Sequence, residues 1–313
     1  TTPLIGARHI PVKVALFAAE DSTASVIFWK IRLPRTCLAW LAGAGLAVAG
    51  MAFQAMFRNP LATPFTLGVS SGASLGAAVG IRLAFGFVLL GLSSVHICAM
   101  VGALAAIGFV YSLTRLKRDF SPAAMLLAGV AVNYFFSSLI LILQYTADFY
   151  DTFRILRWLL GGFQMVGFQA SWQVLFFVVT GTCLLAILAG ELNLITTGEE
   201  IAISRGVSLH RVKTILFLTV SLMVGIVVSI CGPIGFVDLL CPHICRLVVG
   251  PDHRRLLPTT FFFGGGFLVL CDTIARTLFS PTELPVGIFT AFLGGPFFLW
   301  LLLRSARRGS VPV

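Results

Sequence analysis

Two long apolar runs are separated by ELNLITTGEEIAISRGVSLHRVK, residues 191–213, the longest charged interruption in the second half of the chain. The flanking runs, at about 171–190 and 213–231, each approach the roughly 20 residues that a helix needs to cross a bilayer. Between Gly198 and Gly206 the acidic residues come first and an arginine comes last, the order that a helix dipole favours. The segment therefore predicts a helix of about two turns, held outside the hydrocarbon between two membrane spans. An ordinary connecting loop is the alternative.

The composition of the whole chain is that of a membrane protein. Of its 313 residues, 58% are hydrophobic and 11% are charged, less than half the charged share of an average soluble protein. The long apolar runs favour membrane-spanning helices, because a β-barrel would have shorter segments of alternating polarity. The net charge of +10 is explained by orientation and contact with lipid headgroups, without nucleic-acid binding. The sequence predicts an all-α polytopic membrane protein.

Nine segments are interpreted as membrane spans from their apolar runs and the glycine and proline residues between them. They lie near 37–57, 65–85, 92–113, 123–145, 171–190, 213–231, 237–249, 259–280 and 288–303. The aromatic, mixed-charge segment at 146–168 is typical of an interfacial or re-entrant helix. We therefore expect a periplasmic or interfacial arm at 1–35 and a single transmembrane domain over 36–313.

Basic residues predict the orientation, because loops rich in lysine and arginine stay in the cytoplasm. The side that contains 191–213 has Arg58, Arg115, Lys117, Arg118, Arg205, Arg211, Lys213, Arg246, Arg254, Arg255, Arg304, Arg307 and Arg308. The opposite side has Arg82, Arg154, Arg157 and Arg276, besides the basic N-terminal arm. The first side is therefore expected to be cytoplasmic. A further span before Thr1 would also bring the start of the chain to the cytoplasm, and we expect one.

Cysteine and histidine residues do not form a recognisable metal or haem motif. Cys241 and Cys245 flank His243 at C-x3-C spacing, without the second pair that a zinc site needs. His96 and His243 do not share a helix face, as a membrane haem would require. We expect the seven cysteines to pack as small apolar side chains, with no metal site.

Landmark motifs follow one another along the chain in a fixed order. They are IRLPR (31–35), QAMFRNPLATPFTLGVSSGASLG (54–76), LLAGVAVN (126–133), RWLLGG (157–162), GEEIAISRGV (198–207), GPIGFVDLLCPHICRLVVGPDHRRLLP (232–258), DTIAR (272–276) and ELPVGIFTAFLGGPFFLWLL (283–302). In order and spacing they resemble the iron-chelate and vitamin B12 uptake permeases, the FecCD-like (BtuC-type) membrane subunits of type II ABC importers. The resemblance covers essentially the whole chain. Such permeases usually have ten spans, which agrees with a span before Thr1.

The resemblance implies partners and a division of labour. The permease would be a homodimer in a bacterial or archaeal plasma membrane, with two ATP-binding cassette ATPase subunits inside and a soluble substrate-binding protein outside. The chain has no GxxxxGK[ST] phosphate loop, so we expect no enzyme activity from it. ATP and Mg²⁺ would bind the partner ATPase, and this chain would bind no cofactor. The cargo would be a ferric siderophore, haem or cobalamin; a molybdate- or tungstate-type oxyanion is the alternative.

Two groups of residues take contact roles from the resemblance. Contact with the ATPase is implied for Gly198, Glu199, Glu200, Ile201, Ala202, Arg205 and Gly206. Docking of the binding protein is implied for Arg32, Arg35 and Arg276. For Arg276 a structural role is equally open, because Asp272 lies four residues earlier on the same helix and can pair with it.

A translocation pathway is the third role that the resemblance implies. Its candidates are Asn133 and Gln144 in the lining, Phe135 and Phe136 as a gate, and Asp238. The two amides serve equally well as interhelical hydrogen bonds, and Asp238 as a buried or paired carboxylate. Gly232, Pro233 and Gly235 predict either a hinge or a static kink.

An ion-driven secondary transporter is the rival class. It would normally have several carboxylates at mid-membrane and an internal repeat. The sequence offers only Asp238 and no clear repeat. The importer permease is therefore the favoured prediction.

Overall fold

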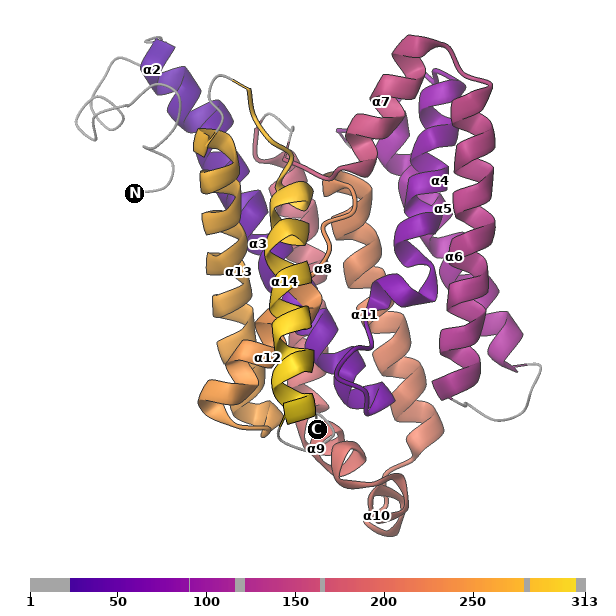
Figure 1. The fold of residues 1–313 in the computed structure, drawn as a ribbon, viewed down its shortest axis with the longest axis vertical. Coiled ribbons are helices and arrows are strands. Elements are labelled where there is room, and N and C mark those ends of the chain that lie inside the picture. The colour runs from indigo at the N-terminus through magenta and orange to yellow at the C-terminus, as the bar shows by residue number, and fades with distance from the viewer. Residues whose placement is uncertain (1–22, 90, 116–121, 164–166, 279–281, 308–313) are drawn as a thin grey trace.

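The structure is a computed structural model that describes residues 23–89, 91–115, 122–163, 167–278 and 282–307. Within these ranges it is a bundle of helices with one short β-hairpin, Val88–Leu89 paired with Leu92–Ser93 (Figure 1). The longer helices are α3 Leu33–Phe57, α4 Val69–Arg82, α5 Ser94–Arg115, α6 Pro122–Tyr145, α8 Gln169–Ile187, α11 Leu209–Cys231, α12 Val237–Val249, α13 His253–Leu278 and α14 Val286–Arg307. The shorter ones are α2 Thr23–Val26, the π-helix η2 Ile27–Arg32, the 3₁₀ helix η3 Pro64–Leu67, α7 Phe149–Leu159, α9 Ala189–Thr197 and α10 Glu199–Ser204.

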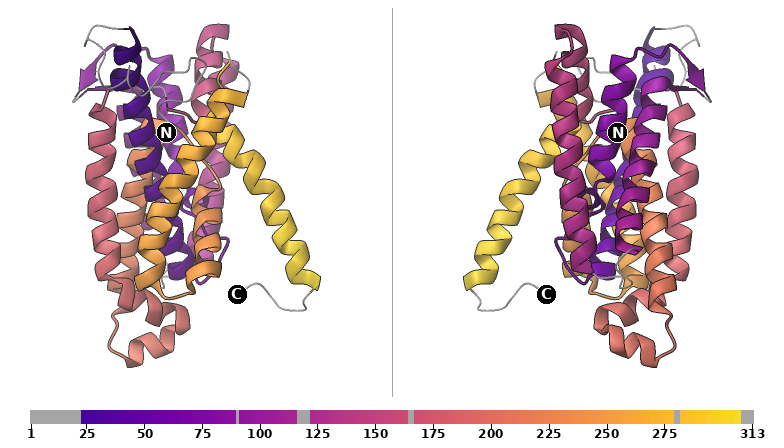
Figure 2. Two further views of the ribbon diagram at one scale, coloured as in Figure 1. Left: turned by 90° about the vertical axis from the view of Figure 1, so that its left-hand side faces the viewer. Right: turned by 90° about the vertical axis from the view of Figure 1, so that its right-hand side faces the viewer.

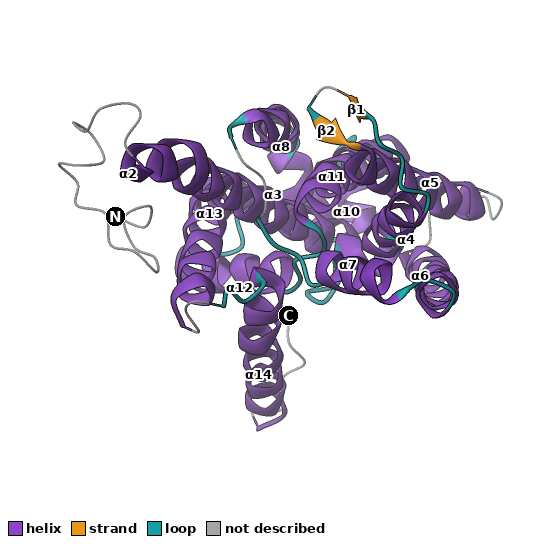
Figure 3. Ribbon diagram, turned by 90° about the horizontal axis from the view of Figure 1, so that it is seen from above, coloured by secondary structure: helices purple, strands orange, loops and turns teal. Residues whose placement is uncertain are grey.

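Helix α3 is the centre of the bundle, with α8, α11, α12 and α13 packed around it (Figure 3). Its small residues allow this, since neighbouring helices approach closely only where side chains are short. A Cβ on Gly43 would collide with the backbone oxygen of Gly264 in α13. One on Gly50 would collide with the backbone oxygen of Asp238 in α12. The glycine- and alanine-rich sequence of α3 therefore fixes the positions of both helices.

A second group of helices, α4 to α7, lies beside the first, and α11 contacts both groups. Helices α4 and α5 cross at glycines on both sides: a Cβ on Gly102 would meet the backbone oxygen of Gly72, and one on Gly76 that of Cys98. Close contact between the two backbones stabilises the crossing by van der Waals packing, because the hydrophobic effect does not drive helices together inside a bilayer. On the α4 side, this crossing uses the small residues of GVSSGASLG, residues 68–76.

Substitution of valine for Gly102 should prevent the close crossing of α4 and α5, because its side chain would overlap the α4 backbone. We expect a large loss of folded, monodisperse protein in detergent, measured by size-exclusion chromatography. Gly108→Val is the matched control, since Gly108 is on the same helix and has no atom within 4 Å of an added Cβ. Equal yields of the two variants would show that the crossing does not limit folding.

Among the described residues, six helical segments are long and apolar enough to cross a membrane: Ile27–Phe57, Ser94–Leu113, Ala124–Tyr145, Gln169–Ile187, Leu209–Cys231 and His253–Leu278. The chain is therefore a multi-pass membrane protein. The three other expected spans correspond to α4, α12 and α14. The first two have 14 and 13 residues, fewer than the roughly 20 of a full crossing. The count of nine spans thus remains a prediction.

The segment before α3 is helical further upstream than the sequence suggested. An uninterrupted helical path runs from Thr23 through the π-helix into α3, so the first span begins well before Cys37. The assignment of 1–35 to an arm stays a prediction, and its first 22 residues lie outside the described part.

The segment at 146–168 contains the short amphipathic helix α7, as its mixed composition suggested. Asp148 caps this helix by accepting a hydrogen bond from the backbone N–H of Asp151. Ile155 points into the bundle, whereas Phe149 and Tyr150 are exposed. Helix α7 lies at the end of the molecule opposite α10 (Figure 1).

Helix α14 diverges from the rest of the bundle. Figure 2 shows its first turns against the body and its far end well away from it. Phe292, Leu299 and Leu303 are 72%, 66% and 64% exposed on this helix. This large apolar surface of α14 contacts no other described part of the chain, so it would face lipid or another protein.

Candidate functional site

Helices α9 and α10 form a projection at one end of the bundle, which we call the coupling end (Figure 1). Its root is anchored because Leu192 and Ile195 of α9 and Ala202 of α10 are completely buried. Ile201 and Ile203, on either side of Ala202, are 46% and 58% exposed. A six-residue helix is thus held rigidly while it presents two large apolar side chains outward.

The turn after α10 depends on glycine. The backbone N–H of Gly206 donates to the carbonyl oxygen of Ile203 at 2.9 Å, and Gly206 has a φ of 86°. A side chain is disfavoured at this left-handed φ. Arg205 lies at the C-terminal end of α10, where a cation stabilises the helix dipole. The two-turn helix predicted between Gly198 and Gly206 is therefore present, with a second helix, α9, before it.

Glu199 has a structural partner that the sequence analysis did not assign to it. Its carboxylate lies 2.8 Å from the Nζ of Lys213, whose side chain is only 4% exposed. A buried ammonium needs such a partner, because transfer of an unpaired charge out of water is costly. Glu200 is exposed instead. Of the two acids, Glu199 thus holds α10 against α11, and Glu200 faces outward.

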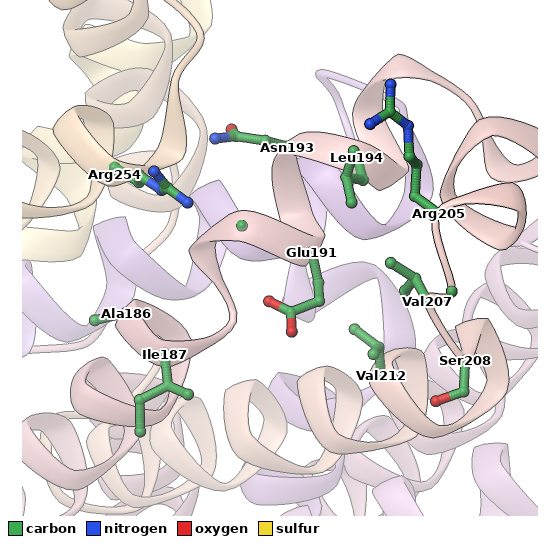
Figure 4. Close-up of a pocket in the computed structure, with 12 residues that line it drawn as sticks. Ala186, Ile187, Glu191, Asn193, Leu194, Arg205, Val207, Ser208, Val212 and Arg254 are labelled. Carbon is green, nitrogen blue, oxygen red and sulfur yellow. The ribbon is translucent and has the colours of Figure 1, made fainter.

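A groove of about 830 Å³ lies beside this projection (Figure 4). Glu191 of α9 lies on one side of it, and Ser208 and Val212 at the start of α11 lie on the other. Arg205 and Arg254 add two guanidinium groups to its lining. The groove therefore presents both signs of charge next to the exposed isoleucines, which suits a protein surface better than a small apolar ligand.

Asn193 connects α9 to the turn between α12 and α13. Its Nδ2 donates to Asp252 at 2.7 Å, and its Oδ1 accepts from the backbone N–H of His253 at 2.9 Å. The hydrogen bond from Asn193, followed by one from the backbone N–H of Arg254, holds the pKa of the Asp252 carboxyl below its ordinary value. Movement of α9 would therefore be passed to the α12–α13 turn through one amide side chain.

The three arginines expected to dock a binding protein lie together at the opposite end of the bundle. Arg35 contacts Asp272 at 2.8 Å and Glu283 at 2.7 Å, and Arg276 lies 3.3 Å from the same Asp272. Arg32 is buried next to this cluster. The i,i+4 pair of Asp272 and Arg276 is therefore present, and Asp272 also binds Arg35 in another helix. The docking role itself stays a prediction.

Asn133 and Gln144 line a shared groove of about 490 Å³ between α4 and α6. Its other polar lining residues are Ser70, Ser71, Ser74 and Ser137. Asn133 donates to the carbonyl oxygens of Phe65 and Thr66, at 3.1 and 3.3 Å, so it also ties α6 to η3. Phe135 is 58% exposed on the outer face of α6. Its ring lies 5.8 Å from that of Phe136, centroid to centroid, and neither ring lines the groove.

The structure does not bring Asp238 into that groove. The Asp238 side chain is in α12, 1% exposed, where α12 packs against α3. Its Oδ2 has no hydrogen-bond partner among the described residues. Its assignment to the pathway stays a prediction, and the geometry favours the interpretation as a buried carboxylate.

The Gly232–Gly235 segment crosses two other backbone turns. Gly232 has a φ of 70°, and a Cβ there would lie 2.6 Å from the carbonyl oxygen of Trp158. The N–H of Gly162 donates to the carbonyl oxygen of Cys231 at 2.7 Å. A Cβ on Gly287, at the start of α14, would collide with the carbonyl oxygen of Leu160. Three segments thus meet backbone to backbone here, and rotation about Gly232, Pro233 and Gly235, which connect α11 to α12, would move α12 relative to α11.

Several residues of these sites were not found from the sequence. The role of Lys213 could have been found from the sequence, because a lysine inside an apolar run needs a carboxylate partner. Asn193 and Glu283 gave no such signal, because their partners are far away in the sequence. Among the described residues, no three histidine, cysteine or carboxylate side chains gather as a metal site would require.

Comparisons with known proteins agree with this architecture. Residues 2–304 match the model of the FecCD transport family. The uncharacterised ABC transporter permease protein YvrB of Bacillus subtilis is 41% identical over 97% of this chain and 89% of its own length. The hemin transport system permease protein HmuU of Yersinia pestis is 39% identical over 98% and 92%, and the vitamin B12 import system permease protein BtuC of Yersinia pseudotuberculosis is 39% identical over 91% and 84%.

A solved structure of a transporter assigned to the metal-chelate type of ABC transporters, in an inward-facing conformation, has a similar fold. It superposes with a TM-score of 0.84 at 29% identity, over 97% of this chain and 95% of that one. The family match and the relatives each cover most of the chain, as the order of landmark motifs had indicated. The chain belongs to the FecCD transport family of ABC transporter permeases.

Proposed function

We propose that this chain is the permease subunit of an ATP-driven importer, and that α9 and α10 transmit the movement of a partner ATPase to the membrane helices. The observation that supports this most directly is the buried root and exposed tip of the projection. Ala202 has no exposed surface, while Ile201 and Ile203 lie open beside a groove of mixed charge. ATP and Mg²⁺ would bind the ATPase, and this chain would bind no cofactor.

The coupling end would then lie in the cytoplasm of a bacterial or archaeal cell, as the distribution of basic residues predicts. The opposite end would lie outside and receive the substrate-binding protein. Arg32, Arg35 and Arg276 are candidates for that contact. Asp272 and Glu283 already neutralise part of their charge, so an acidic partner would have to compete with Glu283, whose side chain is 57% exposed.

The permease would work as a homodimer. A second copy would cover part of the exposed apolar surfaces of α6 and α14, and lipid would cover the rest. The serine-lined groove with Asn133 and Gln144 would lie along the translocation pathway, with Phe135 and Phe136 as bulky neighbours. Gly232, Pro233 and Gly235 would act as the hinge that lets α12 move relative to α11 during alternating access.

The cargo would be a metal chelate: a ferric siderophore, haem or cobalamin. Relatives named for hemin and for vitamin B12 are about equally similar to this chain, so they support the class and not one member of it. They do not favour a molybdate- or tungstate-type oxyanion.

Reconstitution with the cognate ATPase and binding protein tests this proposal. We expect uptake of haem, cyanocobalamin or a ferric siderophore into proteoliposomes, and this uptake should require ATP, the ATPase and the binding protein together. Molybdate is measured in parallel. Uptake of molybdate alone would contradict the chelate class, and uptake driven by a proton or sodium gradient without ATP would contradict the importer mechanism.

A further inference from the structure

A second pocket at the coupling end, of about 410 Å³, is distinct from the groove described above and shares no lining residue with it. It is enclosed by the end of α3, the turn after it, the end of α9, and the region where α12 meets α13. Its lining residues are Gln54, Ala55, Arg58, Asn59, Pro60, Thr196, Thr197, Arg246, Pro251 and His253. Two of the ten are arginines and none is a carboxylate, so the lining is cationic.

Gln54 lines this pocket and has an unused donor. The Nη2 of Arg246 donates to the Oε1 of Gln54 at 2.9 Å, which fixes the orientation of the amide. The Nε2 of Gln54 is therefore the group that remains, and it is buried without a hydrogen-bond partner in the described part of the chain. Gln54 is only 3% exposed. An unsatisfied buried N–H₂ costs about 1–3 kcal/mol, so the pocket favours an acceptor here.

His253 presents a second unused atom. The Oδ1 of Asn193 already accepts from the backbone N–H of His253, so the imidazole Nδ1, 2.7 Å from the same oxygen, must carry a proton. In the neutral ring the Nε2 is then an acceptor. This Nε2 is buried and has no partner among the described residues, and His253 is 3% exposed. In the neutral ring this atom would accept a hydrogen bond from a proton-bearing oxygen.

The arginines and the unused atoms of Gln54 and His253 together favour one chemical class of ligand. The guanidinium groups of Arg58 and Arg246 exclude a cation, and the unsatisfied polar atoms disfavour an apolar occupant. A carboxylate offers only acceptors, whereas a phosphate that holds one proton near neutral pH offers acceptors to Gln54 and the arginines and a donor to His253. We propose that this pocket is a binding site for the phosphate group of an anionic ligand.

Two sources of that group are compatible with the position of the pocket. Arg58 is exposed where α3 ends, at the level where lipid headgroups lie if this helix crosses the bilayer. A soluble phosphate compound could enter from the same side. In either case the ligand would contact Thr196 and Thr197 at the end of α9, directly before α10. The proposal does not depend on the cargo or on the assignment of the chain as an importer.

Binding is tested on the full chain purified in neutral detergent. Inorganic phosphate is titrated and followed by ³¹P NMR line broadening, and retention of phosphatidylglycerol against phosphatidylcholine is measured by native mass spectrometry. The informative variants are Arg58→Gln, which changes an exposed residue, and His253→Asn, whose amide can still donate to Asn193 but has no Nε2. Arg211→Gln is the control, because Arg211 is exposed at the same end and does not line the pocket.

We expect each pocket variant to weaken phosphate binding at least about tenfold, the effect of one lost charge-assisted hydrogen bond, and the control to bind as the original chain does. If the pocket variants bind free phosphate more weakly than the original chain and the control do, the ligand is a soluble phosphate compound. Selective retention of phosphatidylglycerol, lost in the variants, would identify a headgroup. Absence of both, or binding that the pocket variants and the control reduce equally, would overturn the proposal and leave the pocket to water.

Discussion

Lysine at both Ile201 and Ile203 should abolish ATP-driven uptake while the permease remains folded. Both side chains are exposed at the tip of α10 and neither belongs to the buried core, so their replacement leaves the core intact. If this tip enters a cleft of the ATPase, two buried apolar anchors are lost and two charges are placed in their position. Losses at such central contacts are about 2 kcal/mol or more each, which corresponds to roughly thirtyfold weaker association per residue.

Two measurements separate this result from a general defect. Co-purification of the ATPase reports association, and ATP-dependent uptake in proteoliposomes reports coupling. Arg211→Gln, an exposed change at the same end but outside α10, should leave both unchanged. If the double lysine variant retained uptake and bound the ATPase normally, the coupling role of α10 would have to be abandoned.

The segment at 191–213 illustrates how far the sequence alone could reach. Its position between two apolar runs predicted a short helix outside the membrane, and α10 is that helix. The preceding helix α9 was not predicted, because Asn193 and the two threonines near its end are poor helix formers. Tertiary packing stabilises α9 despite this weak local propensity, because Leu192 and Ile195 are fully buried in the bundle.

The start of the first span shows the opposite limit. The expected arm covered residues 1–35, yet a continuous helical path already runs through Lys30, Arg32 and Arg35. Arg35 is tolerated there because Asp272 and Glu283 from distant segments pair with it, and no local pattern can reveal a partner more than 200 residues away. The apolar runs themselves predicted the long helices well, since hydrophobic length is a local property.

The same cluster gives the second large effect, on stability. Replacement of Asp272 by alanine should destabilise the permease by about 3–5 kcal/mol, the cost of leaving a buried charge without its partner. Asp272 has a side-chain exposure of 3% and lies between Arg35 and Arg276, at 14% and 5%, so one change leaves two guanidinium groups facing each other. Glu283→Gln is the matched control, because this carboxylate is 57% exposed and its pair with Arg35 should contribute only about 0–1 kcal/mol.

The apparent melting temperature in detergent distinguishes the source of this cost. If repulsion between unpaired arginines is responsible, the double variant Asp272→Ala with Arg276→Leu should melt higher than Asp272→Ala alone, because the second change removes one of the two charges. A double variant less stable than the single one would mean that Arg276 stabilises the fold through contacts other than Asp272. If Asp272→Ala melted at the same temperature as Glu283→Gln, water would have to enter the cluster and screen the arginines. Since Asp272 joins α3 to α13 while Arg276 keeps an Nη2 without a partner in the described structure, the first outcome is the one that the geometry favours.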